Sequence, residues 1–194
     1  MNPLDIEKLK RADLIISDFD GTIARLGCDW KKIRFFVQNR LEAAGISSGE
    51  PPGTFDSAMR VLRFKSGESE FQALCNELSV LELENFSESR IYRDVYRILL
   101  DRLPARLGVL SLNCRKTLET AFSIPALAKL EPVLIGKEDI REAKPNPEGI
   151  TLLLKHFGVP SERTVYIGDS DVDAQAAASA KVRFIEVDCG RPFE

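Results

Sequence analysis

Two carboxylates follow a short apolar run near the start of the chain. The run Leu14-Ile15-Ile16-Ser17 is typical of a buried strand, and Asp18, Asp20 and Gly21 come directly after it. In an extended chain residues i and i+2 share a face, so the two carboxylates are expected to point the same way. Such close anions resist ionising unless a cation lies between them, which is one way to build a metal site. A strand that ends in a polar Asp-Gly turn would give the same pattern.

Further polar residues follow the later predicted strands and loops. Ser111 ends one apolar run, Lys144 lies in a loop before a helix, and an acidic cluster of Asp169, Asp171 and Asp173 follows another run. The carboxyl ends of parallel strands meet at one edge of a sheet, so these groups are expected to converge. Oxygen ligands without a nearby His or Cys favour Mg²⁺, whose usual partner is a phosphate. Asp171 could ligate the metal or cap the helix that follows it.

The elements that must position these residues alternate between strand and helix outside one long helical stretch. This alternation predicts an α/β fold, a Rossmann-like doubly wound parallel sheet. The predicted strands cover residues 14–17, 106–112, 132–136, 164–168 and 182–187, and the predicted helices of this part cover 3–11, 115–122, 147–157 and 171–180.

A helical stretch of roughly eighty residues interrupts this pattern after the first strand. Helical spacing of apolar residues predicts an α-helical cap with its own apolar seam. Its helices are expected over residues 29–44, 55–65, 69–83 and 87–103, with a loop at 47–53 that contains Pro51-Pro52. The predicted domains are therefore an α/β core of residues 1–23 and 104–194 and a helical cap domain of residues 24–103.

The composition of the 194-residue chain excludes several classes of protein. A net charge of −3 and the lack of a long basic block disfavour a nucleic-acid partner, and no apolar run approaches the ~20 residues of a membrane span. The N-terminus lacks the features of a secretion signal, so a cytoplasmic location is expected. A monomer or homodimer is expected as well. The four cysteines are scattered and are expected to be free buried thiols: Cys28, Cys75, Cys114 and Cys189.

The ordered motifs carry a family resemblance. Asp18-Phe19-Asp20-Gly21-Thr22, then Ser111, Lys144-Pro145 and Gly168-Asp169-Ser170-Asp171-Val172-Asp173 resemble the four motifs of the haloacid dehalogenase-like (HAD) hydrolases. The resemblance covers essentially the whole chain, and residues 24–103 stand where that superfamily carries a helical cap. Within this superfamily the sequence most resembles the phosphoglycolate-phosphatase-like branch.

The resemblance implies a reaction for the acidic residues. Asp18 would be the nucleophile that forms an aspartyl-phosphate intermediate. Asp20 would protonate the leaving oxygen and then deprotonate the attacking water. Mg²⁺ would be held by Asp18, the main-chain carbonyl of Asp20, and Asp169.

The remaining motif residues would bind the phosphoryl group. Ser111 and nearby backbone N–H groups such as that of Leu112 would hold its oxygens, with Thr22 fixing the loop. Lys144 would neutralise charge on the nucleophile and the phosphoryl group. Asp173 would act through a metal-bound water or by orienting the lysine.

The function expected from these roles is a Mg²⁺-dependent phosphatase that acts on a small phosphorylated metabolite, such as a phosphoglycolate-like, sugar or nucleotide phosphate ester. The alternatives are a phosphomutase of the β-phosphoglucomutase type and a non-catalytic module that binds a phospholigand. A glycosyltransferase with a metal-binding Asp-x-Asp would leave Lys144 and Asp169 unexplained.

Two features bear on substrate recognition. Leu112 stands where the family often has Asn, and Asn113 comes one place later. Arg60 and Arg63 are spaced to share a helix face of the cap, from which one could read an anionic group of the substrate, although a solvated surface explains the same spacing.

Overall fold

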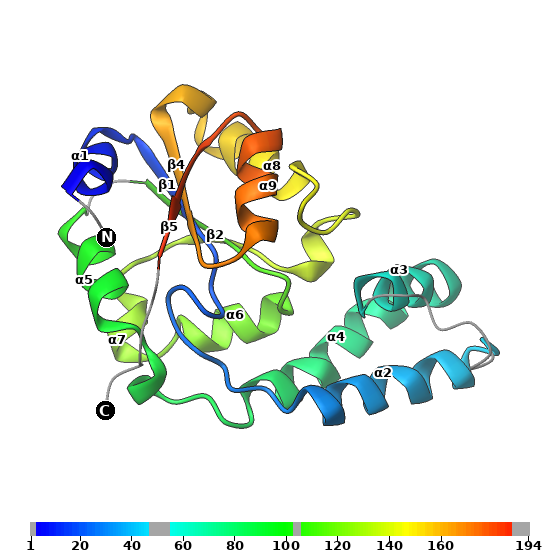
Figure 1. Ribbon diagram of the computed structural model, residues 1–194. Helices are drawn as coiled ribbons and strands as arrows, with labels where there is room; N and C mark the ends of the chain where they lie inside the picture. Colours follow the sequence, from blue (N-terminus) through cyan, green and yellow to red (C-terminus); the bar gives the residue numbers. More distant parts are fainter. Residues whose placement is uncertain (1–2, 47–54, 103–105, 188–194) are drawn as a thin grey trace.

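The computed structural model describes residues 3–46, 55–102 and 106–187. Over these residues it contains one five-stranded parallel sheet with the strand order β3-β2-β1-β4-β5 (Figure 1). The strands are β1 (Leu14–Ser17), β2 (Arg106–Leu110), β3 (Val133–Ile135), β4 (Thr164–Gly168) and β5 (Arg183–Glu186). The expected doubly wound α/β fold is thereby confirmed.

Helices cover both faces of the sheet. The helices around the sheet are α1 (Pro3–Arg11), α5 (Arg93–Asp101), α6 (Arg115–Ala121), α7 (Pro125–Ala128), α8 (Glu148–Phe157) and α9 (Asp171–Ser179), with short 3₁₀ turns at Glu88–Arg90, Lys137–Asp139 and Ser161–Arg163. Residues of α1, α5, α6 and α7 pack in one buried cluster, and residues of α8 and α9 pack in another.

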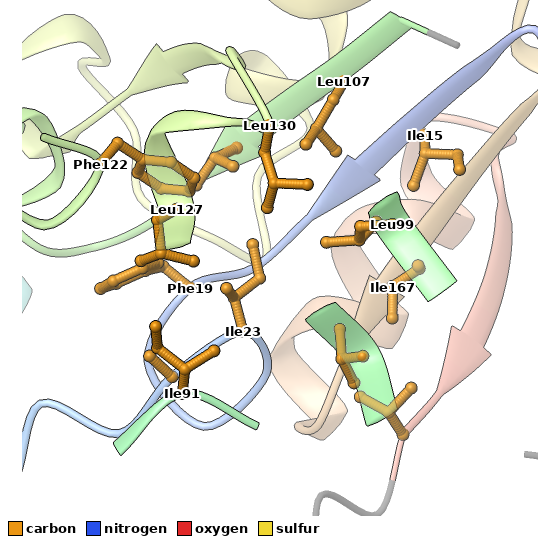
Figure 2. Packing of buried hydrophobic residues seen from close by; sticks show 14 of the residues in the cluster. Ile15, Phe19, Ile23, Ile91, Leu99, Leu107, Phe122, Leu127, Leu130 and Ile167 are labelled. Carbon is orange, nitrogen blue, oxygen red and sulfur yellow. The ribbon is translucent and has the colours of Figure 1, made fainter. Parts of the chain in front are cut away.

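The alternation of side chains along each strand produces these two clusters. Ile15 of β1 lies in the first cluster, whereas its neighbours Leu14 and Ile16 lie in the second. Figure 2 shows the first cluster, in which Ile15 and Phe19 lie with residues contributed by helices far away in sequence. Because both faces are apolar, the strands read as continuous hydrophobic runs, and this is why the sequence revealed them.

The cap consists of α2 (Trp30–Ala43), α3 (Phe55–Ser66) and α4 (Glu68–Leu83), which extend away from the sheet in Figure 1. Asp29 begins α2 by accepting hydrogen bonds from the N–H groups of Lys31 and Lys32, as an N-cap does. The three helices enclose a separate apolar cluster that includes Ile33, Leu62 and Leu78.

The fourth helix expected in the cap, over residues 87–103, is wrong in two respects. The helix is interrupted at Ile91, which forms a β-bridge with Ala24, and α5 begins only at Arg93. Val95 and Leu99 of α5 then pack in the cluster of the sheet and not among the cap helices. The boundaries 24 and 103 of the cap domain stay a prediction, and the loop at 47–53 and residue 103 lie outside the described residues.

Buried polar contacts hold the cap against the core. Glu82 of α4 accepts hydrogen bonds from the N–H of Cys114 (2.9 Å) and from Thr117 Oγ1 (2.5 Å), at the start of α6. Arg63 of α3 donates to the carbonyl oxygens of Ile140 (2.6 Å) and Glu138 (3.0 Å). These contacts place the cap over the loops that follow β2 and β3.

Among the described residues, the helices are all too short or too polar to cross a membrane.

Candidate active site

The loop after β1 is folded tightly around Phe19. The carbonyl oxygen of Phe19 accepts hydrogen bonds from the N–H groups of residues 22, 23 and 24, and its ring is fully buried between Phe86 and Phe122. Gly21 adopts a φ of +94°, a conformation that L side chains rarely adopt. Because Phe19 is anchored in the core, the flanking carboxylates of Asp18 and Asp20 are left at the carboxyl edge of the sheet.

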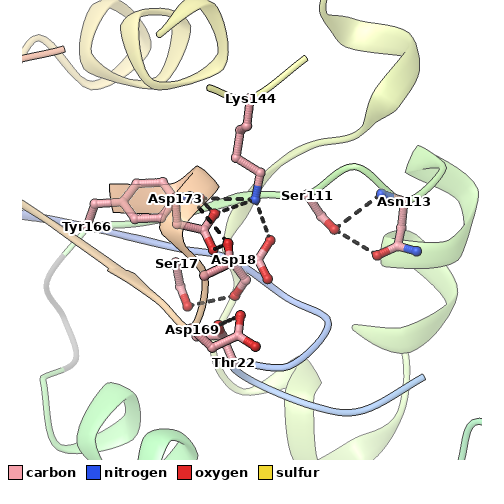
Figure 3. Close-up of polar contacts among 10 residues, drawn as sticks. Ser17, Asp18, Thr22, Ser111, Asn113, Lys144, Tyr166, Asp169 and Asp173 are labelled. Carbon is pink, nitrogen blue, oxygen red and sulfur yellow. Dashed lines mark hydrogen bonds and ion pairs between the residues drawn. The ribbon is translucent and has the colours of Figure 1, made fainter. Parts of the chain in front are cut away.

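A buried lysine joins two of the predicted site residues. Lys144 Nζ lies 2.7 Å from Asp18 Oδ1 and 2.6 Å from Asp173 Oδ1, and the three side chains are at least nine-tenths buried (Figure 3). Asp18 follows β1, Lys144 lies in the loop before α8, and Asp173 lies in the first turn of α9. The structure thus brings together three residues that are 126 and 29 positions apart in sequence.

Burial and charge act in opposite directions on this group. Burial raises the pKa of Asp18 to about 7, and Asp173 adds to the rise, while the cation of Lys144 opposes it. Burial lowers the pKa of Lys144, but the attraction of Asp18, Tyr166 and Asp173 outweighs it and the pKa lies well above the ordinary value. The lysine therefore stays charged at neutral pH and holds a carboxylate that costs free energy to ionise.

The third carboxylate of the site comes from the loop after β4. Ligand oxygens of Asp18, Asp169 and Asp173 all lie within 4.8 Å of one another, and Asp169 Oδ1 accepts a hydrogen bond from Thr22 Oγ1 (3.2 Å). A Cβ at position 21 would collide with Asp169 Oδ2, so only glycine permits this approach of the two loops. Three carboxylates with hard oxygen donors at one point fit a Mg²⁺-like cation.

Asp20 is held differently from Asp18. Its Oδ1 accepts a hydrogen bond from the N–H of Leu26 (2.8 Å), which fixes the carboxyl group beside the segment that leads from β1 to α2. Burial raises the pKa of Asp20, and the charge of Asp169 raises it further, against the effect of the Leu26 hydrogen bond. The side chain is only partly buried, so it can exchange a proton with a substrate or with water.

The predicted phosphate-binding residues after β2 form a local hydrogen-bonded turn. Ser111 Oγ donates to Asn113 Oδ1 (2.8 Å) and accepts from the N–H of Asn113 (3.2 Å), so Figure 3 shows its hydroxyl turned toward Asn113. Asn113 is buried and Leu112 is half-buried between them. Asn113 therefore contacts Ser111 one place after the usual family position. That Ser111, Leu112 and Thr22 bind phosphate stays a prediction.

Two residues of the site were missed by the sequence reasoning. Tyr166 Oη donates to Asp173 Oδ1 (3.0 Å) and lies 3.3 Å from Lys144 Nζ, and Ser170 Oγ donates to Asp173 Oδ2 (2.5 Å). A tyrosine in an otherwise apolar strand was the signal, because a buried hydroxyl needs a partner. Ser170 is also the N-cap of α9, so the alternative reading of Asp171 as that cap is wrong.

The two arginines of α3 are already paired within the protein. Arg60 forms an ion pair with Glu142 (2.7 Å), and Arg63 forms one with Glu68 (2.6 Å) in addition to its contacts with the core carbonyls. A carboxylate of the protein therefore already balances the charge of each guanidinium group. The contacts favour a structural role for Arg63 over recognition of the substrate.

Comparison with known proteins extends these observations. A pyrophosphatase PpaX from Listeria welshimeri is 31% identical over 93 residues, which are 46% of this chain and 42% of the relative. A phosphoglycolate phosphatase from Salmonella paratyphi A is 36% identical over 76 residues, 37% of this chain and 30% of the relative. The chain thus spans less than half the length of these two curated relatives.

The structural comparison covers more of the chain. A solved structure described as a haloacid dehalogenase-like hydrolase from Bacteroides fragilis matches 94% of this chain and 95% of its own, with a TM-score of 0.62 and 23% identity. At this identity the match shows a shared fold. The sequence model of the haloacid dehalogenase-like hydrolases matches residues 15–187, which is most of the chain. The chain belongs to the haloacid dehalogenase-like hydrolase family.

Proposed function

We propose that this protein is a Mg²⁺-dependent phosphatase that hydrolyses a small phosphate ester through an aspartyl-phosphate on Asp18. The observation that carries the proposal is the convergence of Asp18, Lys144, Asp169 and Asp173 at the carboxyl edge of the sheet. An ion pair of Lys144 with Asp18 and Asp173, built only for stability, would have no need of a third carboxylate from Asp169 beside it. The relatives are named for phosphatase and pyrophosphatase activities, and this supports the reaction class.

The contacts of Asp18 support its proposed role as the nucleophile. Its N–H donates to the carbonyl of Ile167 in β4 (2.9 Å), and Lys144 fixes one carboxylate oxygen. The lysine would also attract the phosphoryl oxygens, so that two anions can approach each other. Mg²⁺ held by Asp18, Asp169 and the main-chain carbonyl of Asp20 would supply further neutralisation of phosphoryl charge. Asp173 would keep the lysine in position, since three hydrogen-bond donors hold its carboxylate.

Asp20 is suited to carry the proton. A general acid must be protonated when the ester oxygen leaves, and the raised pKa of Asp20 favours that form. The same group would then accept a proton from the water that attacks the phosphorus. The backbone hydrogen bond from Leu26 would hold the carboxyl group in place for both steps.

The substrate is expected to be a small molecule and not a nucleic acid or a membrane lipid. In this proposal the core residues bind the phosphoryl group, so the cap would recognise the rest of the substrate. The monomer or homodimer and the cytoplasmic location expected from the sequence belong to this proposal as well.

Phosphate release across a panel of phosphate esters and pyrophosphate, with Mg²⁺ and then with a chelator, tests the proposal. We expect turnover that the chelator abolishes and added Mg²⁺ restores. Asp18→Asn should lower turnover by at least about 10³-fold, and Asp20→Asn by about 10²–10⁴-fold. Asp13→Asn is the matched control, because Asp13 pairs with Arg163 at the opposite edge of the sheet.

Each alternative predicts a different result. A phosphomutase would yield an isomeric ester in place of free phosphate. A binding module would bind an ester without turning it over. Full activity of Asp18→Asn would refute the aspartyl-phosphate route.

A further inference from the structure

Two cysteines meet where the cap packs on the core. Cys75 lies in the middle of α4, in the cap, and Cys114 directly precedes α6, in the core. Both are fully buried, their sulfur atoms lie within 4.8 Å of each other, and the Cys114 thiol donates to Glu82 Oε1 (3.7 Å). They are 39 positions apart in sequence, so only the packing of α4 against α6 brings them together.

We propose that Cys75 and Cys114 form a reversible disulfide bond that fastens the cap to the core when the protein meets a peroxide. One thiolate attacks hydrogen peroxide, and the O–O bond breaks to give a sulfenic acid and hydroxide. The second thiol then attacks the sulfenic sulfur, so that the S–S bond forms and water leaves. In sum, two thiols are oxidised, one peroxide is reduced, and two waters are released. A dithiol reductant reverses the reaction.

The charges around the sulfur atoms favour a disulfide over a metal site. A carboxylate oxygen of Glu138 lies within 4.8 Å of both thiols, which would complete a set of three metal ligands. However, Lys137 is buried beside them, and its attraction to Glu82, Cys114 and Cys75 raises its pKa against the effect of burial. A buried ammonium repels a divalent cation, which disfavours a metal ion at this point. Glu138 Oε2 is moreover occupied by the N–H of Arg115 (2.8 Å).

Burial controls when this chemistry can occur. The neighbouring Cys75 thiol and the burial of the group both raise the pKa of Cys114, so Cys114 is unreactive while the cap is packed on the core. Peroxide must enter while the cap is lifted from the core, after which closure brings the sulfenic acid and the second thiol together. The rate of oxidation should therefore depend on how often the cap separates from the core.

The bond would act on the loop that carries the candidate phosphate-binding residues. Cys114 follows Asn113, whose amide contacts Ser111, and Glu82 of the cap binds the N–H of Cys114. A covalent link at Cys114 would hold this loop and α4 in the arrangement seen here. This effect on turnover rests on the proposed function, whereas formation of the bond does not.

The test uses the full chain with Cys28→Ser and Cys189→Ser, so that Cys75 and Cys114 are the only remaining thiols. After treatment with hydrogen peroxide, the number of thiols that react in denaturant should fall from two to none. The intact mass should fall by two hydrogen atoms, and digestion should yield one peptide that links the two cysteines. Dithiothreitol should restore both thiols.

Further measurements separate formation of the disulfide bond from its effect on turnover and from the proposed phosphatase function. The oxidised protein should unfold at a higher temperature than the reduced one, and this rise should be missing in the same chain with Cys75→Ser. Loss of turnover that dithiothreitol reverses would add the regulatory consequence. If the chain proves to have no phosphatase activity, the mass and the peptide still decide whether the bond forms.

Three results would overturn the proposal. The first is a sulfinic acid on one cysteine with the other thiol intact. The second is a disulfide between chains in place of one within the chain. The third is stoichiometric zinc that leaves when Cys75 is replaced by serine, because it would make the pair a metal site.

Discussion

Replacement of Glu82 by alanine should destabilise the protein more than any substitution of a surface carboxylate. Glu82 comes from the cap but is 2% exposed and reaches into the core. Its carboxylate accepts from the N–H of Cys114 and from Thr117, and lies 3.5 Å from Lys137 Nζ. Lys137 is 8% exposed and has no comparable ion pair with another residue among those described. Removal of Glu82 therefore leaves a buried ammonium without its counter-ion.

The contacts set the size of the effect. Loss of one partner of a buried ion pair costs about 3–5 kcal/mol, because the other charge stays desolvated. Loss of the side-chain acceptor at the start of α6 costs about 1 kcal/mol more. For a chain of this length, 1 kcal/mol corresponds to roughly 2–4 °C in the midpoint of thermal unfolding. Glu82→Ala should thus lower the midpoint by at least about 8 °C.

Thermal unfolding of three variants tests the reasoning. Glu84→Ala is the matched control, two positions away on the surface, where its ion pair with Lys32 should contribute no more than about 1 kcal/mol. Glu82→Ala combined with Lys137→Met should recover most of the loss, because no buried charge remains unpaired. A shift of the midpoint for Glu82→Ala no larger than that for Glu84→Ala would contradict the reasoning. A double variant less stable than Glu82→Ala would also show that the buried ion pair does not stabilise the contact between cap and core.

Three further predictions concern the site and the seam. Gly21→Ala should disable turnover and lower the free energy of unfolding by at least about 1 kcal/mol, since φ is +94° and the new Cβ would strike Asp169; an active, stable variant in activity and unfolding assays would contradict this. Lys144→Met should lower turnover by about 10²-fold or more and destabilise the fold by about 3–5 kcal/mol, as two buried carboxylates lose their cation; measurement of both quantities checks it. Arg63→Ala should lower the free energy of unfolding by about 1–3 kcal/mol, because Arg63 donates to core carbonyl oxygens, whereas Arg60→Ala should lower it by less than about 1 kcal/mol. Substrate selectivity should stay unchanged in both variants, and altered selectivity across the ester panel would favour a role in substrate recognition.

The centre of the sheet was predictable from the sequence because the central strands β1 and β4 are buried on both faces. Apolar runs such as Leu14-Ile15-Ile16 therefore stand out against their polar flanks, and parallel topology follows from the helices between them. The division of the helices between cap and core was not predictable in full. The spacing of Val95 and Leu99 shows that α5 has an apolar face but not which partner it packs against, and the bridge between Ile91 and Ala24 depends on contacts distant in sequence.

The candidate site divides in a similar way. The motif residues could be assigned to one edge of the sheet because parallel strands end together, and the structure places Asp18, Lys144, Asp169 and Asp173 there. The residues that hold them leave weaker signals. A tyrosine within an apolar strand indicates that the hydroxyl of Tyr166 has a buried partner, but not that this partner is Asp173. Tertiary contacts of this kind have no periodicity to read.

The balance of charge at the site gives an independent reason to expect a bound divalent cation. When ionised, three carboxylates contribute three negative charges to the site, from Asp18, Asp169 and Asp173. Lys144 supplies one positive charge, which leaves a deficit of two positive charges. Burial has already raised the pKa of Asp18 to about 7, so part of this deficit is met by a proton. A divalent cation would cancel the deficit and release that proton, leaving Asp18 as the anion that a nucleophile must be. Binding of Mg²⁺ to the protein near pH 7 should therefore release protons, and Asp18→Asn should abolish the release in a calorimeter with buffers of different ionisation enthalpy.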